Sequence, residues 1–141
     1  MTVKPHRISF LHYFPKRVHQ SGTVQTNFAN KIICGEKIHT IRKTNIRNYN
    51  IGDPLICHSW QGVEYKSKNP FFLNLTVEQT YNFKKEKGLF FLNDNEEEIP
   101  VGLLSEIAAN EGLKLDEFLR WFEDDNFSGQ IISWDKILMY A

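Results

Sequence analysis

The sequence has few residues that could form disulfides or metal sites. Its 141 residues contain only two cysteines, Cys34 and Cys57, and a chain of this length buries enough apolar surface to fold without a disulfide framework. We therefore expect both thiols to be reduced and buried. The five histidines show no HxxxH spacing and no CxxC pair occurs, so we expect no metal and no other cofactor.

Long hydrophobic runs are also missing. No apolar stretch approaches the roughly 18 residues needed to cross a membrane, so we expect no membrane partner. The first residues lack the apolar stretch and small-residue cleavage site of a secretory signal, which predicts a cytoplasmic protein. Hydrophobic residues at 41% and charged residues at 24% exclude a disordered chain and predict one folded domain over residues 1–141.

Net charge is zero, but the two signs are divided along the chain. Residues 1–70 carry eleven Lys and Arg against three Asp and Glu, and residues 71–141 carry six against fourteen. One face of the fold can therefore be basic, which suits an anionic partner such as RNA, or the two halves can interleave and neutralise each other. The overall balance speaks against a dedicated high-affinity RNA binder, since such domains are clearly basic.

Apolar spacing predicts an α+β domain. Strand signals lie at 7–14, 38–42, 55–60, 63–65, 71–81 and 130–139, and helical signals lie at 27–34, around 103–108 with a stop at Gly112, and at 115–122. Residues 84–98 are charged and predict a loop that holds an apolar patch at 89–92. Because strands and helices do not alternate regularly, we expect the sheet to curl into a barrel.

The most informative stretch is residues 35–42, where a predicted helix stop leads into a strand. Strand alternation puts Thr40 and Arg42 on one face and His39 on the other. Lys37 can join Thr40 only if it lies in the turn before the strand or if a β-bulge redirects it. An ordinary solvated strand end would show the same spacing.

A second candidate is Glu111, beside Gly112 at the junction between two predicted helices. A carboxylate there lies near a helix C-terminus, where the helix dipole disfavours negative charge. The position is slightly unfavourable for stability, which favours a functional role for this carboxylate. A solvated glutamate between two helices is the alternative that the spacing leaves open.

Together these residues resemble the ASCH domain family. The resemblance rests on the GxKxxTxR element within 33–42, on Gly-Asp at 52–53 before a strand, and on the stretches 108–113 and 127–132. The first element is fairly specific, whereas the Gly-Asp pair and the closing strand would mean little alone. The resemblance covers the chain from about Phe28 to the C-terminus and implies a PUA-like fold, a small β-barrel with flanking helices.

The resemblance also implies a site. In small bacterial ASCH proteins similar to this chain, an amidohydrolase activity removes the acetyl group of N4-acetylcytidine with a lysine, a threonine and a glutamate. Lys37 and Thr40 match the first two within the motif, and Glu111 matches the third by its place before the second helix of the pair. Arg42 matches the motif arginine, which is assigned to ligand binding. Lys114 departs from the threonine or serine expected near the start of that helix, which affects substrate choice more than fold.

Amide hydrolysis needs an activated oxygen nucleophile, a donor for the developing oxyanion and an acid for the leaving amine. Thr40 can supply the nucleophile if Lys37, neutral in a poorly hydrated pocket, takes its proton. Glu111 would then activate water or protonate the amine. In the alternative, Glu111 is the base toward water and Lys37 stays charged as an oxyanion donor. The sequence does not separate these two assignments.

Aromatic residues of the basic half are candidates to stack on a pyrimidine. They are Tyr13, Trp60 and Tyr65, and His39 joins them as a candidate substrate-binding residue. Core packing is the alternative for each ring. Trp121 lies on the apolar face of the last predicted helix and is expected to pack there.

These residues are compatible with three functions. The first is a metal-independent amidohydrolase that acts on an N-acylated nucleoside such as N4-acetylcytidine, or on a related small amide. The second is a non-catalytic module that binds single-stranded or modified RNA, or a modified nucleoside, in the same cleft. The third is a ribonuclease in which Lys37 and a carboxylate move protons at the 2′-OH.

Overall fold

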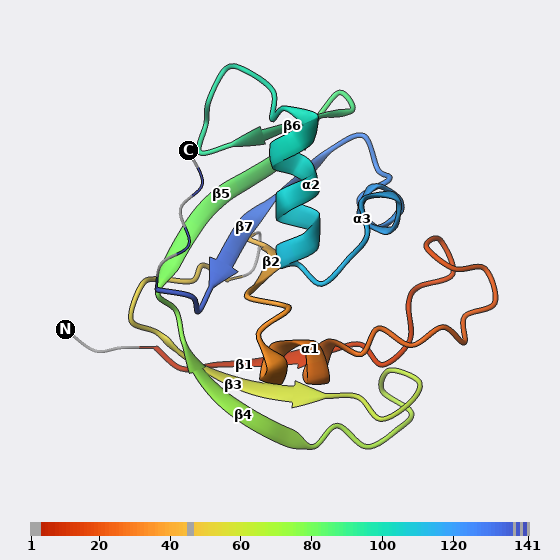
Figure 1. Cartoon of the computed structure of the whole chain (residues 1–141). Helices are drawn as coiled ribbons and strands as arrows, with labels where there is room; N and C mark the ends of the chain where they lie inside the picture. The colour runs from red at the N-terminus through yellow and green to blue at the C-terminus, as the bar shows by residue number, and fades with distance from the viewer. Residues whose placement is uncertain (1–3, 45–46, 137, 139, 141) are drawn as a thin grey trace.

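The fold has seven strands in two sheets and three helices, and Figure 1 shows it as a computed structural model that describes residues 4–44, 47–136, 138 and 140. The expected α+β class is confirmed. The first sheet has the order β1-β3-β4, with β1 parallel to β3 and β4 antiparallel to it. Its strands are β1 (His6–Phe10), β3 (Pro54–Ser59) and β4 (Phe71–Thr76).

The second sheet is antiparallel throughout and has the order β2-β7-β5-β6. In its central strand, Ile132 pairs with Thr40 on one side and with Thr80 on the other. Thr40 is therefore held by backbone pairing to the middle of the sheet. The strands are β2 (His39–Lys43), β7 (Phe127–Ser133), β5 (Gln79–Glu86) and β6 (Leu89–Leu92).

The three helices lie close to the predicted ranges. They are α1 (Phe28–Cys34), α2 (Val101–Asn110) and α3 (Leu115–Trp121). α1 ends at Gly35, whose φ of 85° is the left-handed conformation that favours glycine, so the predicted stop is confirmed. α1 packs on β1 through Phe28 and Phe10, whose ring centres lie 6.4 Å apart. α2 and α3 stand beside the second sheet (Figure 1).

The run 71–81, predicted as one strand, is divided between the two sheets. The backbone N–H of Val77 donates to the carbonyl of Asp53 at 2.9 Å, and the N–H of Glu78 donates to the carbonyl of Ser133 at 2.8 Å. The chain thus leaves the first sheet and enters the second within two residues. Apolar alternation continues through this change, so the pattern could not reveal it.

The segment 84–98 is a loop only in part, which corrects the prediction. β5 and β6 form a hairpin across Lys87 and Gly88, both with positive φ. Phe90 of β6 stacks on Phe83 of β5 with ring centres 5.6 Å apart. The apolar patch is therefore a four-residue edge strand that covers the core. A strand this short carries too little periodic signal to stand out among charged neighbours.

Strand ends differ from prediction at three further places. Residues 63–65 form a bend and turns rather than a returning strand, and β4 pairs with β3 instead. β1 ends at Phe10, four residues earlier than predicted. β7 spans Phe127–Ser133 rather than 130–139, and Ile137 and Met139 lie outside the described residues. Aromatic residues in loops produced the strand signal beyond these ends.

The two thiols differ in environment. Cys57 on β3 is buried, whereas Cys34 in the last turn of α1 is exposed, and both are free. The prediction of two buried thiols is therefore wrong for Cys34, because α1 is short and turns only Phe28 and Ile32 toward the core. None of the described helices is long and apolar enough to cross a membrane.

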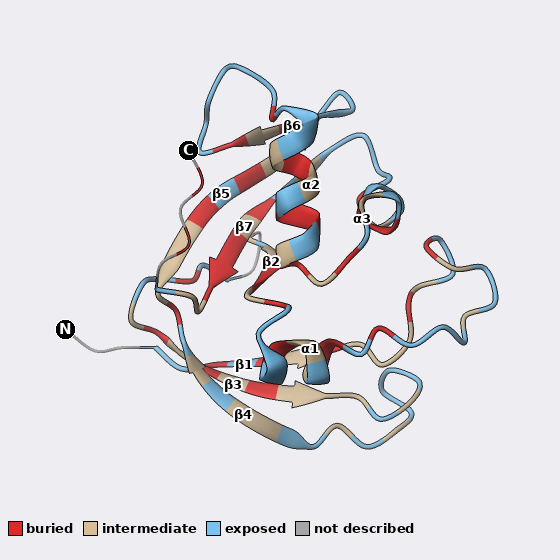
Figure 2. Ribbon diagram, in the orientation of Figure 1, coloured by how far each residue is buried: buried red, intermediate tan, exposed pale blue. Residues whose placement is uncertain are grey.

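Side chains connect the two sheets where strand pairing does not. Among the described residues no pairing closes the sheets into a barrel, so the barrel stays a prediction. Arg42 of β2 donates from Nη2 to the Ser9 carbonyl at 2.9 Å, and Arg47 donates to the Arg7 carbonyl at 3.3 Å. Figure 2 shows the buried residues of the core along β7 and on parts of β5, α1 and α2.

Candidate functional site

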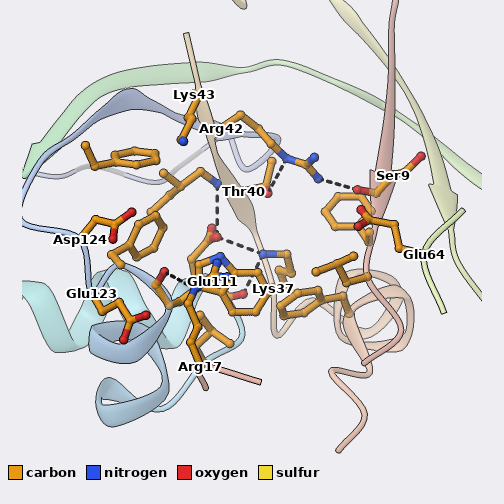
Figure 3. Close-up of a pocket in the computed structure, with 18 residues that line it drawn as sticks. Ser9, Arg17, Lys37, Thr40, Arg42, Lys43, Glu64, Glu111, Glu123 and Asp124 are labelled. Atoms are coloured by element: carbon orange, nitrogen blue, oxygen red, sulfur yellow. Dashed lines mark hydrogen bonds and ion pairs between the residues drawn. The ribbon is translucent and has the colours of Figure 1, made fainter. Parts of the chain in front are cut away.

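A cavity of about 610 Å³ opens between β1, α1, β2 and the end of α3. Lys37, Thr40, Arg42 and Glu111 all line it (Figure 3). The structure thus brings together the three predicted catalytic residues and the predicted ligand-binding arginine, although they come from distant parts of the chain.

Lys37 reaches the cavity from the connection between α1 and β2. β2 begins only at His39, so Lys37 precedes the strand and is not subject to its alternation. Its backbone N–H donates to the Lys31 carbonyl at 3.0 Å, and the next N–H, that of Ile38, donates to the Asn110 carbonyl at 3.0 Å. Of the two alternatives left open by the sequence, the turn rather than the bulge is the one found.

The Lys37 side chain is buried, with 1% of its surface exposed. Its Nζ donates to the backbone carbonyl of Glu111 at 2.7 Å and lies 3.4 Å from Oε2 of the same residue. The ring centre of Phe28 lies 4.5 Å from Nζ. Burial lowers the pKa of Lys37 to about 8, with Glu111 opposing this shift and Arg42 adding to it.

Glu111 follows the last residue of α2, as predicted, and is 6% exposed. His39 Nδ1 lies 2.7 Å from Oε1, and the backbone N–H of Ile41 donates to Oε2 at 3.2 Å. Burial alone would raise the pKa of Glu111, but the charge of Lys37 and the hydrogen bond with His39 outweigh it and lower the pKa. The carboxylate is therefore ionised, and its partners offset the unfavourable helix dipole.

Thr40 and Arg42 share one face of β2, as alternation predicts. Arg42 Nε donates to Thr40 Oγ1 at 3.3 Å, and the Arg42 guanidinium carbon lies 5.1 Å from the ring centre of Phe10. Burial lowers the pKa of Arg42 from its ordinary value. Gly129 of β7 pairs with Lys43 of β2, and a Cβ at Gly129 would overlap the Arg42 carbonyl oxygen. A glycine is thus required for β7 to approach β2 at this point.

Aromatic rings form much of the remaining wall. Trp121 was predicted to pack in the core; it does contact Phe28, with ring centres 5.8 Å apart, but it also lines the cavity. Phe10 and Phe28 line the cavity as well and were not predicted to do so. Both occupy apolar positions of regular elements, so no sequence signal separates them from ordinary core residues.

Four predicted substrate-binding residues are not among the described residues that line the cavity. Tyr13 sits in a bridge with Gln25, away from the cavity wall. Trp60 and Tyr65 pack on each other with ring centres 5.2 Å apart, and Tyr65 is 83% exposed. His39 is completely buried behind Glu111, because alternation turns it away from the face of Thr40.

Charges of both signs surround the cavity mouth. The exposed residues at the rim are Arg17, Lys43, Glu64, Glu123 and Asp124. Arg17 and Lys43 from the first half of the chain meet Glu123 and Asp124 from the second half here, and Glu64 adds an acid from the first half. At this cavity the two halves therefore interleave, which is the second of the alternatives that the charge pattern allowed.

The cavity combines a buried amine, a hydroxyl, a guanidinium and a carboxylate, which are groups suited to proton transfer and to stabilising an oxyanion. Within the described part of the chain, no three His, Cys, Asp or Glu residues form a group that could hold a metal ion. Comparison of the chain with protein-family models, with curated proteins and with solved structures gives no match. The cavity itself is therefore the basis for assigning a function.

Proposed function

We propose that the chain is a metal-independent amidohydrolase that hydrolyses the exocyclic amide of an N-acylated nucleoside such as N4-acetylcytidine. One observation carries this proposal: the Lys37 ammonium contacts the Glu111 carboxylate inside the cavity that Thr40 also lines. The proposal includes membership of the ASCH family. It also includes the PUA-like barrel of that family, in which the two sheets would be halves of one curved sheet.

The size and walls of the cavity suit such a substrate. A volume of about 610 Å³ lies within the range of roughly 300–1,000 Å³ typical of small-molecule sites. The rings of Phe10, Phe28 and Trp121 offer flat apolar surfaces on which a pyrimidine can stack. Arg42, whose guanidinium carbon lies 5.1 Å from the ring centre of Phe10, would donate to a carbonyl oxygen of the ligand.

The proposed reaction has two steps. Neutral Lys37 takes the proton of the Thr40 hydroxyl, and Thr40 Oγ1 attacks the acetyl carbon. The carbon–nitrogen bond breaks, and the Lys37 ammonium returns the proton to the departing amine, which leaves as cytidine. Water then hydrolyses the Thr40 acetyl ester, which releases acetate and restores the hydroxyl.

The environments of the two ionisable groups favour Lys37 over Glu111 as the base. With a pKa of about 8, Lys37 is neutral in about one molecule in ten at pH 7. Glu111 has a lowered pKa, and both of its oxygens accept hydrogen bonds, so it is a weak base toward water. In the proposed mechanism Glu111 holds the Lys37 amine and stabilises the ammonium that forms.

The rim favours a free nucleoside over a polymer. At the mouth, where a bound RNA strand would place further phosphates, three exposed carboxylates outnumber the two exposed cations: Glu64, Glu123 and Asp124 against Arg17 and Lys43. Repulsion between these carboxylates and a phosphate backbone disfavours RNA binding and RNA cleavage at this site.

The test uses Thr40 and a matched threonine. Thr40 and Thr80 pair with the same residue of β7 from opposite sides, but Thr80 is not among the described residues that line the cavity. The purified protein is incubated with N4-acetylcytidine, other N-acylated nucleosides and short RNA, and products are separated by chromatography. We expect cytidine to form, Thr40→Val to lower its rate of formation about 100-fold or more, and Thr80→Val to leave the rate unchanged.

Three outcomes contradict the proposal. Equal turnover in Thr40→Val and Thr80→Val would show that Thr40 is not the nucleophile. Retention of nucleoside or RNA without any product would indicate a binding module. Shortened RNA that depends on Lys37 while acetylated nucleosides stay intact would indicate a ribonuclease.

A further inference from the structure

A chain of buried hydrogen bonds leads from the cavity to the last described residue. His39 Nδ1 lies 2.7 Å from Glu111 Oε1, and His39 Nε2 lies 2.6 Å from the hydroxyl of Tyr140. Asn110 Nδ2 donates to the same hydroxyl at 2.9 Å. His39, Tyr140 and Glu111 are all buried, so water does not compete for these contacts.

The donors and acceptors in this chain determine where each proton lies. The amide nitrogen of Asn110 can only donate, so the Tyr140 oxygen accepts from it. Burial raises the pKa of Tyr140, so the phenol keeps its proton and donates it to His39 Nε2. His39 Nε2 then accepts, which leaves the ring proton on Nδ1, where it faces Glu111.

The opposite arrangement conflicts with the carboxylate. If His39 carried its proton on Nε2 instead, the lone pair of Nδ1 would face an ionised oxygen of Glu111 at 2.7 Å. Two acceptors at that distance repel each other, and neither could turn to water. If both ring nitrogens were protonated, the Tyr140 proton would have no acceptor among the contacts of the described residues.

We propose that His39 is a positioning residue: in its neutral form with the proton on Nδ1, fixed by Tyr140 and Asn110, it holds Glu111 in the orientation that places Lys37 in the cavity. Because His39 contacts Oε1 of Glu111, Oε2 is the carboxylate oxygen that faces Lys37. The kinetic part of this inference rests on the proposed function, whereas the proton position does not.

The first experiment measures the proton position directly. Two-bond proton–nitrogen NMR spectra of protein with ¹⁵N-labelled histidine, recorded at pH 7.5, distinguish the two neutral forms of a ring. The His39 signals are identified by their loss in His39→Asn. We expect the pattern of a ring protonated on Nδ1 only.

A pair of tyrosine variants tests what fixes that proton. Tyr81 and Tyr140 lie in one cluster, with ring centres 5.2 Å apart, and both are buried, but only Tyr140 contacts His39. Tyr140→Phe leaves Nε2 without its donor while Glu111 still faces Nδ1, so we expect the His39 pattern to change toward a ring protonated on both nitrogens, and we expect Tyr81→Phe to leave it unchanged. A wild-type ring protonated on Nε2, or an unchanged pattern in Tyr140→Phe, overturns the inference.

Kinetics with N4-acetylcytidine test the positioning. We expect His39→Leu to lower kcat about 10-fold to 100-fold at nearly constant KM, the range found where a residue orients a metal ligand. His39→Asn should recover part of the loss, because its amide can donate to Glu111. Equal kcat values in the Leu and Asn variants argue against positioning. If the wild type cleaves no amide, the proposed function fails, and the NMR result still decides the proton position.

Discussion

Two of the buried acid–base pairs among the described residues differ in what surrounds them. His6 Nε2 lies 2.8 Å from Asp53 Oδ2, and Lys37 Nζ lies 3.4 Å from Glu111 Oε2. All four side chains are buried. Asp53 also accepts from the backbone N–H groups of Asn50 at 3.0 Å and of residue 4 at 3.3 Å, so its pair ties a loop to β1. The Lys37 pair lines a cavity, whereas neither His6 nor Asp53 is among its described lining residues.

The comparison shows which property marks the candidate site. Burial alone would raise the pKa of either carboxylate, yet hydrogen bonds and nearby charge lower it in both Asp53 and Glu111. A shifted carboxylate therefore does not distinguish a structural pair from a functional one. The distinguishing group is the base, because Lys37 combines a lowered pKa with access to a cavity.

The largest expected effect separates the pairs by activity. Lys37→Met removes the proposed base but fits the same space beside Phe28, and we expect kcat for N4-acetylcytidine to fall about 100-fold to 10,000-fold. Asp53→Asn should leave the turnover of folded protein unchanged. Both are measured by release of cytidine at a temperature where circular dichroism shows each variant folded. A similar loss of turnover in both variants would erase the distinction.

The next effect separates the pairs by stability. Asp53→Ala removes the acceptor of His6 and of two backbone N–H groups, so we expect the free energy of unfolding to fall by about 2–4 kcal/mol. Exposed Glu106 on α2 provides the control, since Glu106→Ala should change it by less than about 0.5 kcal/mol. Urea unfolding monitored by circular dichroism measures both.

The lowered pKa of Asp53 adds a pH signature to the same measurement. Its contribution is complete above the ordinary aspartate pKa of about 3.9 and is lost as pH falls through the lower folded-state pKa. The gap between wild type and Asp53→Ala should therefore narrow at acid pH. A constant gap from neutral to acid pH contradicts this account.

The smallest expected effect is a shift in the pH dependence of turnover. If neutral Lys37 is the base, kcat/KM rises about tenfold per pH unit below its pKa of about 8 and levels off above it. Glu111 raises the pKa of Lys37, so in Glu111→Gln the midpoint of the residual rate should move to lower pH. Thr80→Val serves as the unshifted control. A rate that stays flat between pH 6 and 9 excludes Lys37 as the base.

Local rules predicted the parts of the site that lie close together in the sequence. Alternation along β2 placed Thr40 and Arg42 on one face and His39 on the other, and the structure has this arrangement. The helix stop at Gly35 follows from its left-handed conformation. These features depend on only a few neighbouring residues, so the sequence carries enough information to predict them.

Contacts across long separations could not be predicted in the same way. His39 and Glu111 are 72 positions apart, and His39 and Tyr140 are 101 apart. No periodicity connects residues at such distances, and only the fold brings them together. Only residue type and the charge of the first half of the chain point to Trp60 and Tyr65, and neither property places a ring on a cavity wall.

The amine of Lys37 also provides a reactive group for chemical labelling inside the cavity. At pH 7 an ordinary lysine with a pKa of about 10.4 is unprotonated in fewer than about one molecule in a thousand, and only the unprotonated amine reacts with acylating reagents. The pKa of about 8 increases that reactive fraction greatly for Lys37. A reagent small enough to enter would therefore acylate this side chain ahead of ordinary lysines. Any occupant of the cavity would shield it, so the mass of one peptide would report occupancy.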